Sequence, residues 1–201
     1  MSSGVEKAWS ELAVLRPEEI YSRTGVTYDR QAARYTVGSF GQDISVFPAD
    51  RIISSCTPLG GYIAEELRSY SHLAILEYLI HAKNVLPTDH LVKPDSLSGG
   101  QIYSKGTHAL PLDQLAKTYG EDRNAFVARG RSLGGTELQF GDASARLHPL
   151  PRLPVAVILW ERDEEFPPRT DFLFYDNCKE QLPPDILWAT AMMTIRLMLK
   201  D

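Results

Sequence analysis

Four carboxylate side chains stand within five residues of one another, directly after an apolar stretch. Residues 161–168 read Glu-Arg-Asp-Glu-Glu-Phe-Pro-Pro, and Trp160 precedes them. Carboxylates this close repel one another unless water or a cation separates them, and the two aromatic rings beside them offer apolar contact. We therefore take residues 161–169, called the acidic loop, as the best candidate binding site. Its candidate residues are Trp160, Glu161, Asp163, Glu164, Glu165 and Phe166.

Three interpretations of the acidic loop are open from the sequence. In the first, water solvates the loop, and Arg162 and Arg169 balance part of its charge. In the second, the loop binds a protein or small-molecule partner. In the third, it holds a hard cation such as Mg²⁺ or Ca²⁺, which prefers oxygen ligands, whereas zinc favours His or Cys. We name no metal ligands and expect no cofactor, because the chain shows no zinc-ligand spacing and no phosphate-loop motif; whether the acidic loop binds a metal stays open.

Groups that could act in catalysis are present, but no catalytic motif surrounds them. Ser144, Thr107 and Cys178 stand in no pattern typical of a strained elbow or a triad. His148 or His108, paired with a carboxylate of the acidic loop, would supply an acid–base pair on the rim of a sheet. A small hydrolase or transferase is therefore the alternative to a non-catalytic binding module.

Two further sets of residues resemble functional groups but favour structural roles. Cys56 and Cys178 lie far apart, without another Cys or a His at zinc-ligand spacing, so we expect two free thiols. Two cysteines also exclude a cluster held by four thiolates of this chain. Glu77 and His81 are four residues apart on a predicted helix, which indicates a contact on the helix surface.

The acidic loop needs two strands to position it. Residues 155–160 are apolar without interruption, which is typical of a strand that is buried on both faces. Residues 170–175 are rich in aromatic side chains and follow Pro167 and Pro168, which stiffen the chain. The sequence therefore predicts a central strand, a long loop and a returning partner strand.

The remaining periodicities predict an α+β fold, with an antiparallel sheet of about five to six strands and helices packed on one face. Residues 34–54 alternate with period two and indicate a meander of three short strands. Residues 84–107 are rich in Pro, Gly and Ser and predict a long loop without the spacing of a phosphate loop. Helices are predicted within residues 5–15, 17–25, 71–83, 111–119, 122–133 and 184–199, and a further strand at 144–149.

Composition places the chain among ordinary globular proteins. Its 201 residues are 43% hydrophobic and 23% charged, which predicts a single domain over residues 1–201. The net charge of −5 argues against nucleic acid as a partner, because phosphate binding needs a basic stripe. The longest apolar run is too short to span a membrane, and no signal segment is evident, so we expect a cytoplasmic protein. The oligomeric state stays open.

Three groups of residues resemble a known prokaryotic family. They are Ala8, Pro17, Glu18, Glu19, Thr24 and Gly25; Leu133, Gly134, Gly135, Gly141 and Asp142; and Leu159, Trp160, Glu161 and 163–168. Through them nearly the whole chain resembles the family catalogued as domain of unknown function 3786. Members of that family occur largely in anaerobic bacteria and archaea, some carry an added four-cysteine iron–sulfur module, and none has established catalytic residues. The resemblance implies an accessory role in anaerobic or cofactor-related metabolism, and the two cysteines printed here are too few for that module.

Overall fold

Two short helices open the chain in the computed structural model, which describes residues 3–97 and 109–200. Helix α2 (Pro17–Thr24) starts with a proline and is followed by Gly25 at a φ of 73°. Proline suits the first turn of a helix, and glycine accepts the left-handed conformation that ends one. Helix α1 (Ser3–Leu12) buries Val5, Ala8, Trp9 and Leu12, the stripe that their spacing predicts.

The predicted meander forms a first antiparallel sheet with the strand order β1-β2-β3-β4. Its strands are β1 (Thr27–Asp29), β2 (Arg34–Ser39), β3 (Gln42–Phe47) and β4 (Ile52–Ser54). Ser39 pairs with Gln42, so the turn between β2 and β3 is Phe40 and Gly41. Both turn residues have a positive φ, 49° and 72°, as a tight two-residue hairpin requires.

Three consecutive helical segments follow the meander, and the last of them packs against α1. They are α3 (Pro58–Gly61), the π-helical turn η1 (Tyr62–Glu66) and α4 (Arg68–His81). The Thr57 hydroxyl accepts a hydrogen bond from the Gly60 N–H at 3.0 Å, which caps the start of α3. Within the described residues, no helix combines the length and the apolar character needed to cross a membrane.

The second sheet is antiparallel, has the order β5-β9-β8-β7-β6 and contains the predicted central strand. Its strands are β5 (Leu91–Val92), β6 (Thr136–Glu137), β7 (Ala143–Leu150), β8 (Leu153–Trp160) and β9 (Arg169–Tyr175). Strand β8 lies between β7 and β9, and its residues 153–159 are all buried. The prediction of a central strand followed by its returning partner is therefore confirmed.

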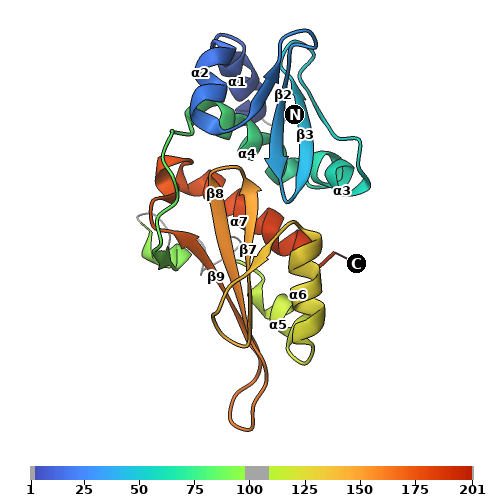
Figure 1. The fold of residues 1–201 in the computed structure, drawn as a ribbon, viewed down its shortest axis with the longest axis vertical. Helices are drawn as coiled ribbons and strands as arrows, with labels where there is room; N and C mark the ends of the chain where they lie inside the picture. The colour runs from blue at the N-terminus through green and yellow to red at the C-terminus, as the bar shows by residue number, and fades with distance from the viewer. Residues whose placement is uncertain (1–2, 98–108, 201) are drawn as a thin grey trace.

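Helices cover one face of the second sheet. Ala145, Val157 and Phe172 lie side by side on that face, and a Cβ added to Gly130 would lie 2.9 Å from the Ala145 Cβ. Figure 1 shows α7 passing behind the strands β7 and β8, next to α6. These helices are α5 (Leu112–Tyr119), α6 (Arg123–Ser132) and α7 (Pro184–Met198); single 3₁₀ turns are η2 (Pro94–Ser96) and η5 (Cys178–Glu180).

The α+β class with antiparallel strands is confirmed, and the strands divide between two sheets instead of forming one sheet of five to six. The turn of the β2–β3 hairpin contacts β7, because the Phe40 N–H donates to the His148 carbonyl at 2.8 Å. The hairpin and β7 nevertheless belong to separate sheets. One cluster of buried apolar side chains contains residues of both sheets, among them Val37 and Val157. That the chain is one domain stays a prediction.

Candidate functional site

The candidate residues lie at the end of the β8–β9 hairpin, which projects from the lower end of the molecule in Figure 1. Trp160 is the last residue of β8 and pairs with Arg169, the first residue of β9. The eight residues between them form the projecting part of the acidic loop. The hairpin therefore brings Trp160 and Arg169 together at the base of the loop.

Hydrogen bonds to two other segments hold the base of the acidic loop. The Glu161 N–H donates to Asp142 Oδ2 at 2.8 Å, and the Arg162 N–H donates to the Gly120 carbonyl at 3.2 Å. A Cβ added to Gly120 would lie 2.6 Å from Pro168 Cγ. Only glycine therefore lets the loop approach the end of α5 this closely.

Asp163 organises the tip of the loop. Its Oδ1 accepts hydrogen bonds from the N–H groups of Glu165 at 2.8 Å and of Phe166 at 2.6 Å. Its own N–H donates to the Phe166 carbonyl at 3.2 Å. This Asx-type turn fixes the backbone that carries Phe166, and the Phe166 side chain stays 65% exposed. The ring thus does not anchor the loop to the core.

The Trp160 ring is held on several sides. Its indole N–H donates to Asp171 Oδ2 at 2.9 Å, and the Arg169 guanidinium carbon lies 4.6 Å from the ring centroid, a cation–π contact. Gly141 packs close to it, because an added Cβ would lie 3.4 Å from Trp160 Cδ2. Lys93 lies 3.8 Å from Asp171. These contacts fix the orientation of the ring.

A groove of about 600 Å³ opens between the loop, the turn before β7 and the start of α5. We call it the tip groove. Its lining residues are Asp113, Asp142, Trp160, Glu161, Asp163, Phe166, Pro167, Pro168 and Arg169. Four of the predicted residues thus meet in it, whereas Glu164 and Glu165 are exposed on the loop outside its lining.

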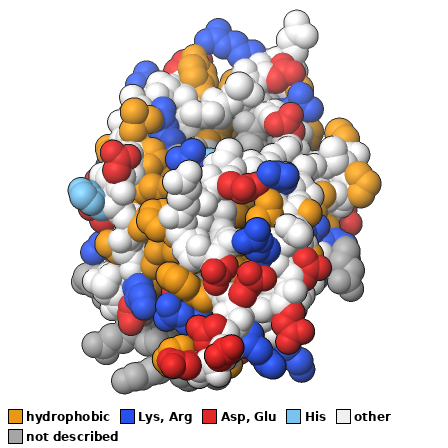
Figure 2. Space-filling model, turned by 60° about the horizontal axis from the view of Figure 1, so that its bottom comes forward, with side chains coloured by type: hydrophobic (Ala, Val, Ile, Leu, Met, Phe, Trp, Pro, Cys, Tyr) orange, Lys and Arg blue, Asp and Glu red, His pale blue; other side chains and the backbone are white. Residues whose placement is uncertain are grey.

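The sequence did not single out two carboxylates of the groove. Asp142 stands in the Gly-Asp turn that contributed to the family resemblance, and this was the available signal. Asp113 lies in the first turn of α5, far from the loop in the sequence, and carries no local signal. Figure 2 shows acidic side chains gathered on the lower part of the forward face, mixed with Lys and Arg and close to hydrophobic side chains.

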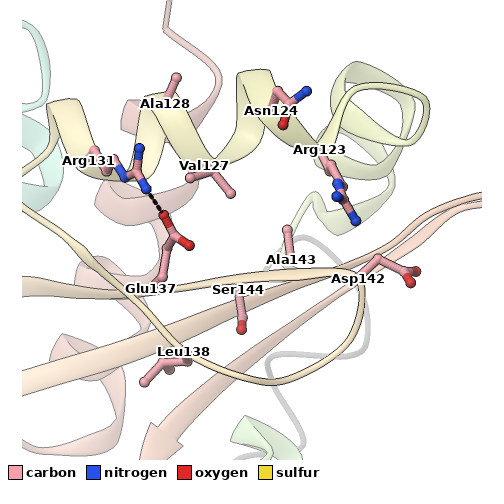
Figure 3. A pocket seen from close by; sticks show the side chains of 10 residues that line it. All are labelled: Arg123, Asn124, Val127, Ala128, Arg131, Glu137, Leu138, Asp142, Ala143 and Ser144. Carbon is pink, nitrogen blue, oxygen red and sulfur yellow. Dashed lines mark ion pairs between the residues drawn. The ribbon is translucent and has the colours of Figure 1, made fainter.

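A second pocket, of about 440 Å³, lies between α6 and the start of β7. Figure 3 shows Arg123 and Arg131 reaching down from α6, with Arg131 paired to Glu137 of β6. The Ser144 hydroxyl accepts the Phe140 N–H at 3.1 Å. Asp142 lines both this pocket and the tip groove, so the two hollows adjoin.

The described part of the chain gathers no group of three His, Cys, Asp or Glu side chains able to hold a metal ion. The carboxylates of the acidic loop instead spread along the groove and the outside of the loop. The hard-cation interpretation therefore finds no ligand set among the described residues.

The candidate acid–base residues lie away from the groove. On β7, His148 is five residues from Ala143, about 17 Å along the strand, and burial together with Arg146 lowers the pKa of His148. His108 and Thr107 fall outside the described residues. On α4, His81 lies 3.2 Å from Glu77, the predicted surface pair, and burial raises the pKa of Glu77.

Both cysteines are free thiols, as predicted. Cys56 is exposed, and Cys178 is buried on η5. Burial raises the pKa of Cys178 to about 12, so at neutral pH it stays protonated and is a poor nucleophile.

Comparison with known proteins identifies the family of the chain. No curated protein and no solved structure matches the chain. The family model described as Domain of unknown function (DUF3786) matches residues 16–197, a stretch that includes both sheets and the tip groove. This match confirms the resemblance seen in the sequence. The chain belongs to the DUF3786 family, whose description assigns no function.

Proposed function

We propose that this protein is a non-catalytic binding module that engages a protein or small-molecule partner at the tip groove. The observation that carries the proposal is Phe166, which is 65% exposed on a loop that hydrogen bonds hold in shape. Aromatic side chains are frequent anchors of binding interfaces, and a fixed backbone presents this ring in one position. A preformed backbone also lowers the entropy cost of ordering the loop on binding.

The length of the acidic loop supports the same proposal. Antiparallel neighbours such as β8 and β9 need only two to five residues to connect them, and here eight residues lie between the strands. The additional residues project from the body of the molecule. Their carboxylates and Phe166 therefore meet solvent or a partner more than the core.

The proposal also assigns a setting and a role. We place the module in a prokaryotic cytoplasm, where it has an accessory role in anaerobic or cofactor-related metabolism. The role is the one that the resemblance to the family implies, and the free thiols of Cys56 and Cys178 suit a reducing compartment. The net charge of −5 favours a partner other than nucleic acid.

The test compares partner retention by Phe166→Ala and by the wild type. Each full-length protein is immobilised, exposed to an extract of the source cells and washed, and the retained proteins and small molecules are identified by mass spectrometry. We expect Phe166→Ala to retain the wild-type partner at least about tenfold less, because truncating an aromatic anchor removes its apolar contact.

A matched control comes from a different exposed apolar residue. Leu86 is 75% exposed and lies in the segment before β5, away from the tip groove. Leu86→Ala should retain the partner as the wild type does. Equal retention by the wild type and Phe166→Ala would overturn the proposal.

A further inference from the structure

The tip groove carries a net negative charge. Four carboxylates and one guanidinium line it. Asp142 and Asp163 already accept hydrogen bonds from backbone N–H groups. The carboxylates of Asp113 and Glu161 have no hydrogen-bonding or ionic partner among the described residues. Two carboxylates thus stay available for a cationic ligand.

The groove already holds one cation of its own. The Arg169 guanidinium lies 4.6 Å from the centroid of the Trp160 ring, and the hydrogen bond to Asp171 fixes that ring. The arrangement shows that a guanidinium fits over the indole face in a groove that carboxylates also line. A cationic side chain of a partner would meet the same chemistry.

Apolar surface accompanies the charge. Phe166 is 65% exposed and Pro167 is also exposed, and both line the groove. A ligand that carries only charge would leave these rings in water, so the surface suits a ligand with cationic and apolar groups together.

We infer that the tip groove binds a basic segment of a partner protein, in which Lys or Arg side chains stand next to apolar ones. The inference rests on the proposed function and names its partner class. Nucleic acid or an anionic membrane would bring phosphates against four carboxylates and be repelled. The volume of about 600 Å³ suits a few side chains of an extended segment.

The test measures the binding of short fluorescent peptides to the full-length protein by anisotropy. The probe alternates Lys and Arg with Leu. One comparison peptide replaces each Lys and Arg by Glu, and a second replaces each Leu by Ser. We expect the probe to bind, the Glu peptide not to bind, and the Ser peptide to bind about tenfold more weakly, because it lacks apolar contact with Phe166.

Two variants with the same net charge separate the groove from general attraction. The loop variant is Glu161→Gln, Asp163→Asn, Glu164→Gln and Glu165→Gln; the control is Asp50→Asn, Glu65→Gln, Glu66→Gln and Asp89→Asn, all exposed and outside the groove. The loop variant should bind the probe at least about tenfold more weakly, and the control nearly as the wild type does. Equal weakening in both would show unspecific charge attraction and overturn the inference.

The variant Arg169→Gln tests whether removing a positive charge from the groove strengthens the binding of the basic probe. Removing the cation that the groove already holds uncovers the Trp160 face and lowers repulsion, so the probe should bind several-fold more tightly. Weaker binding would show that Arg169 is itself needed to hold the site, which contradicts a cationic occupant over Trp160.

If no basic peptide binds while Phe166→Ala still loses the cellular partner, the partner class is wrong and the binding module stands. If Phe166→Ala keeps the partner as well, both proposals fail.

Discussion

At the scale of single residues, the environment of a side chain decides what its chemistry can do. His148 is half-buried on β7, and its neighbour on the same face of the strand is Arg146. Burial and this positive charge both disfavour the protonated imidazole and lower its pKa. Burial also lowers the pKa of His72 on α4. Both rings therefore resist protonation in the folded protein.

These histidines predict a dependence of stability on pH. Because their folded pKa lies below the ordinary value of about 6.5, the unfolded chain binds the protons more readily. Their contribution is complete above about pH 6.5 and is lost as the pH falls through the folded pKa. Their contribution to the free energy of unfolding, measured with urea, should fall between pH 7 and pH 5 by less than about 1.4 kcal/mol per pH unit for each histidine, against an opposite contribution of Glu77, whose pKa is raised by burial.

The variant His148→Gln should show a shallower fall, and His72→Gln/His148→Gln a shallower one still. An unchanged slope in the double variant would contradict the assigned protonation states.

Residue types and spacing predicted part of the candidate site. Trp160, Glu161 and Phe166 stand together in the sequence, so a local pattern was enough to select them. Asp113 and Asp142 reach the same groove from α5 and from the turn before β7. The positions of Asp113 and Asp142 depend on how separate elements pack, and a single sequence does not show which distant residues lie close together in the fold.

At the scale of elements, the acidic loop keeps its shape through hydrogen bonds that its backbone N–H groups donate, whereas the carboxylates of Glu164 and Glu165 take no part in them. Its base is held by Asp142 and Gly120, and its tip by the side chain of Asp163. Glu164 and Glu165 are exposed. Their mutual repulsion opposes the fold of the loop slightly, as repulsion between exposed like charges does.

The loop variant Glu161→Gln, Asp163→Asn, Glu164→Gln and Glu165→Gln should therefore melt at the wild-type temperature or slightly above. Asparagine at position 163 keeps a carbonyl oxygen that can accept the same N–H groups, and the other changes relieve repulsion. Scanning calorimetry of the wild type, with and without a chelator, and of the variant measures this. A much lower melting temperature of the variant would show that the carboxylates support the fold, and the same loss after chelation would show a structural metal.

At the scale of the whole molecule, the two sheets meet through close backbone contacts. Gly41 in the β2–β3 turn and Gly134 after α6 approach so closely that a Cβ added to Gly134 would lie 2.9 Å from the Gly41 Cα. The buried Tyr78 hydroxyl of α4 donates to the Thr24 carbonyl at 2.7 Å and accepts the Arg152 N–H at 3.0 Å. Local periodicity predicted the longer strands but missed the short strands β1, β5 and β6, and it does not say which sheet each strand joins. That assignment follows from the pairing of strands distant in the sequence, such as β5 with β9.

The contact between the sheets predicts a large effect for Gly134→Ala. Gly134 has a φ of 69°, which costs an alanine about 1–2 kcal/mol, and its Cβ would also push against the Gly41 backbone. We expect the free energy of unfolding to fall by about 2–4 kcal/mol, since close packing lets neither backbone move away freely.

Gly61→Ala is the matched control for this substitution. Gly61 has a φ of −59°, and an added Cβ would meet nothing within 4 Å. Alanine there should raise the free energy of unfolding by about 0.5–1 kcal/mol, because it restricts the unfolded chain and favours the helix. Urea unfolding of the wild type and both variants provides the measurement, with the m-value as a second readout.

If Gly134→Ala leaves the unfolding free energy unchanged, the hairpin turn and the end of α6 do not touch. If Gly134→Ala lowers the m-value instead, the two sheets unfold separately once this contact is disturbed. Leu133, Gly134 and Gly135 would then couple the unfolding of the two sheets.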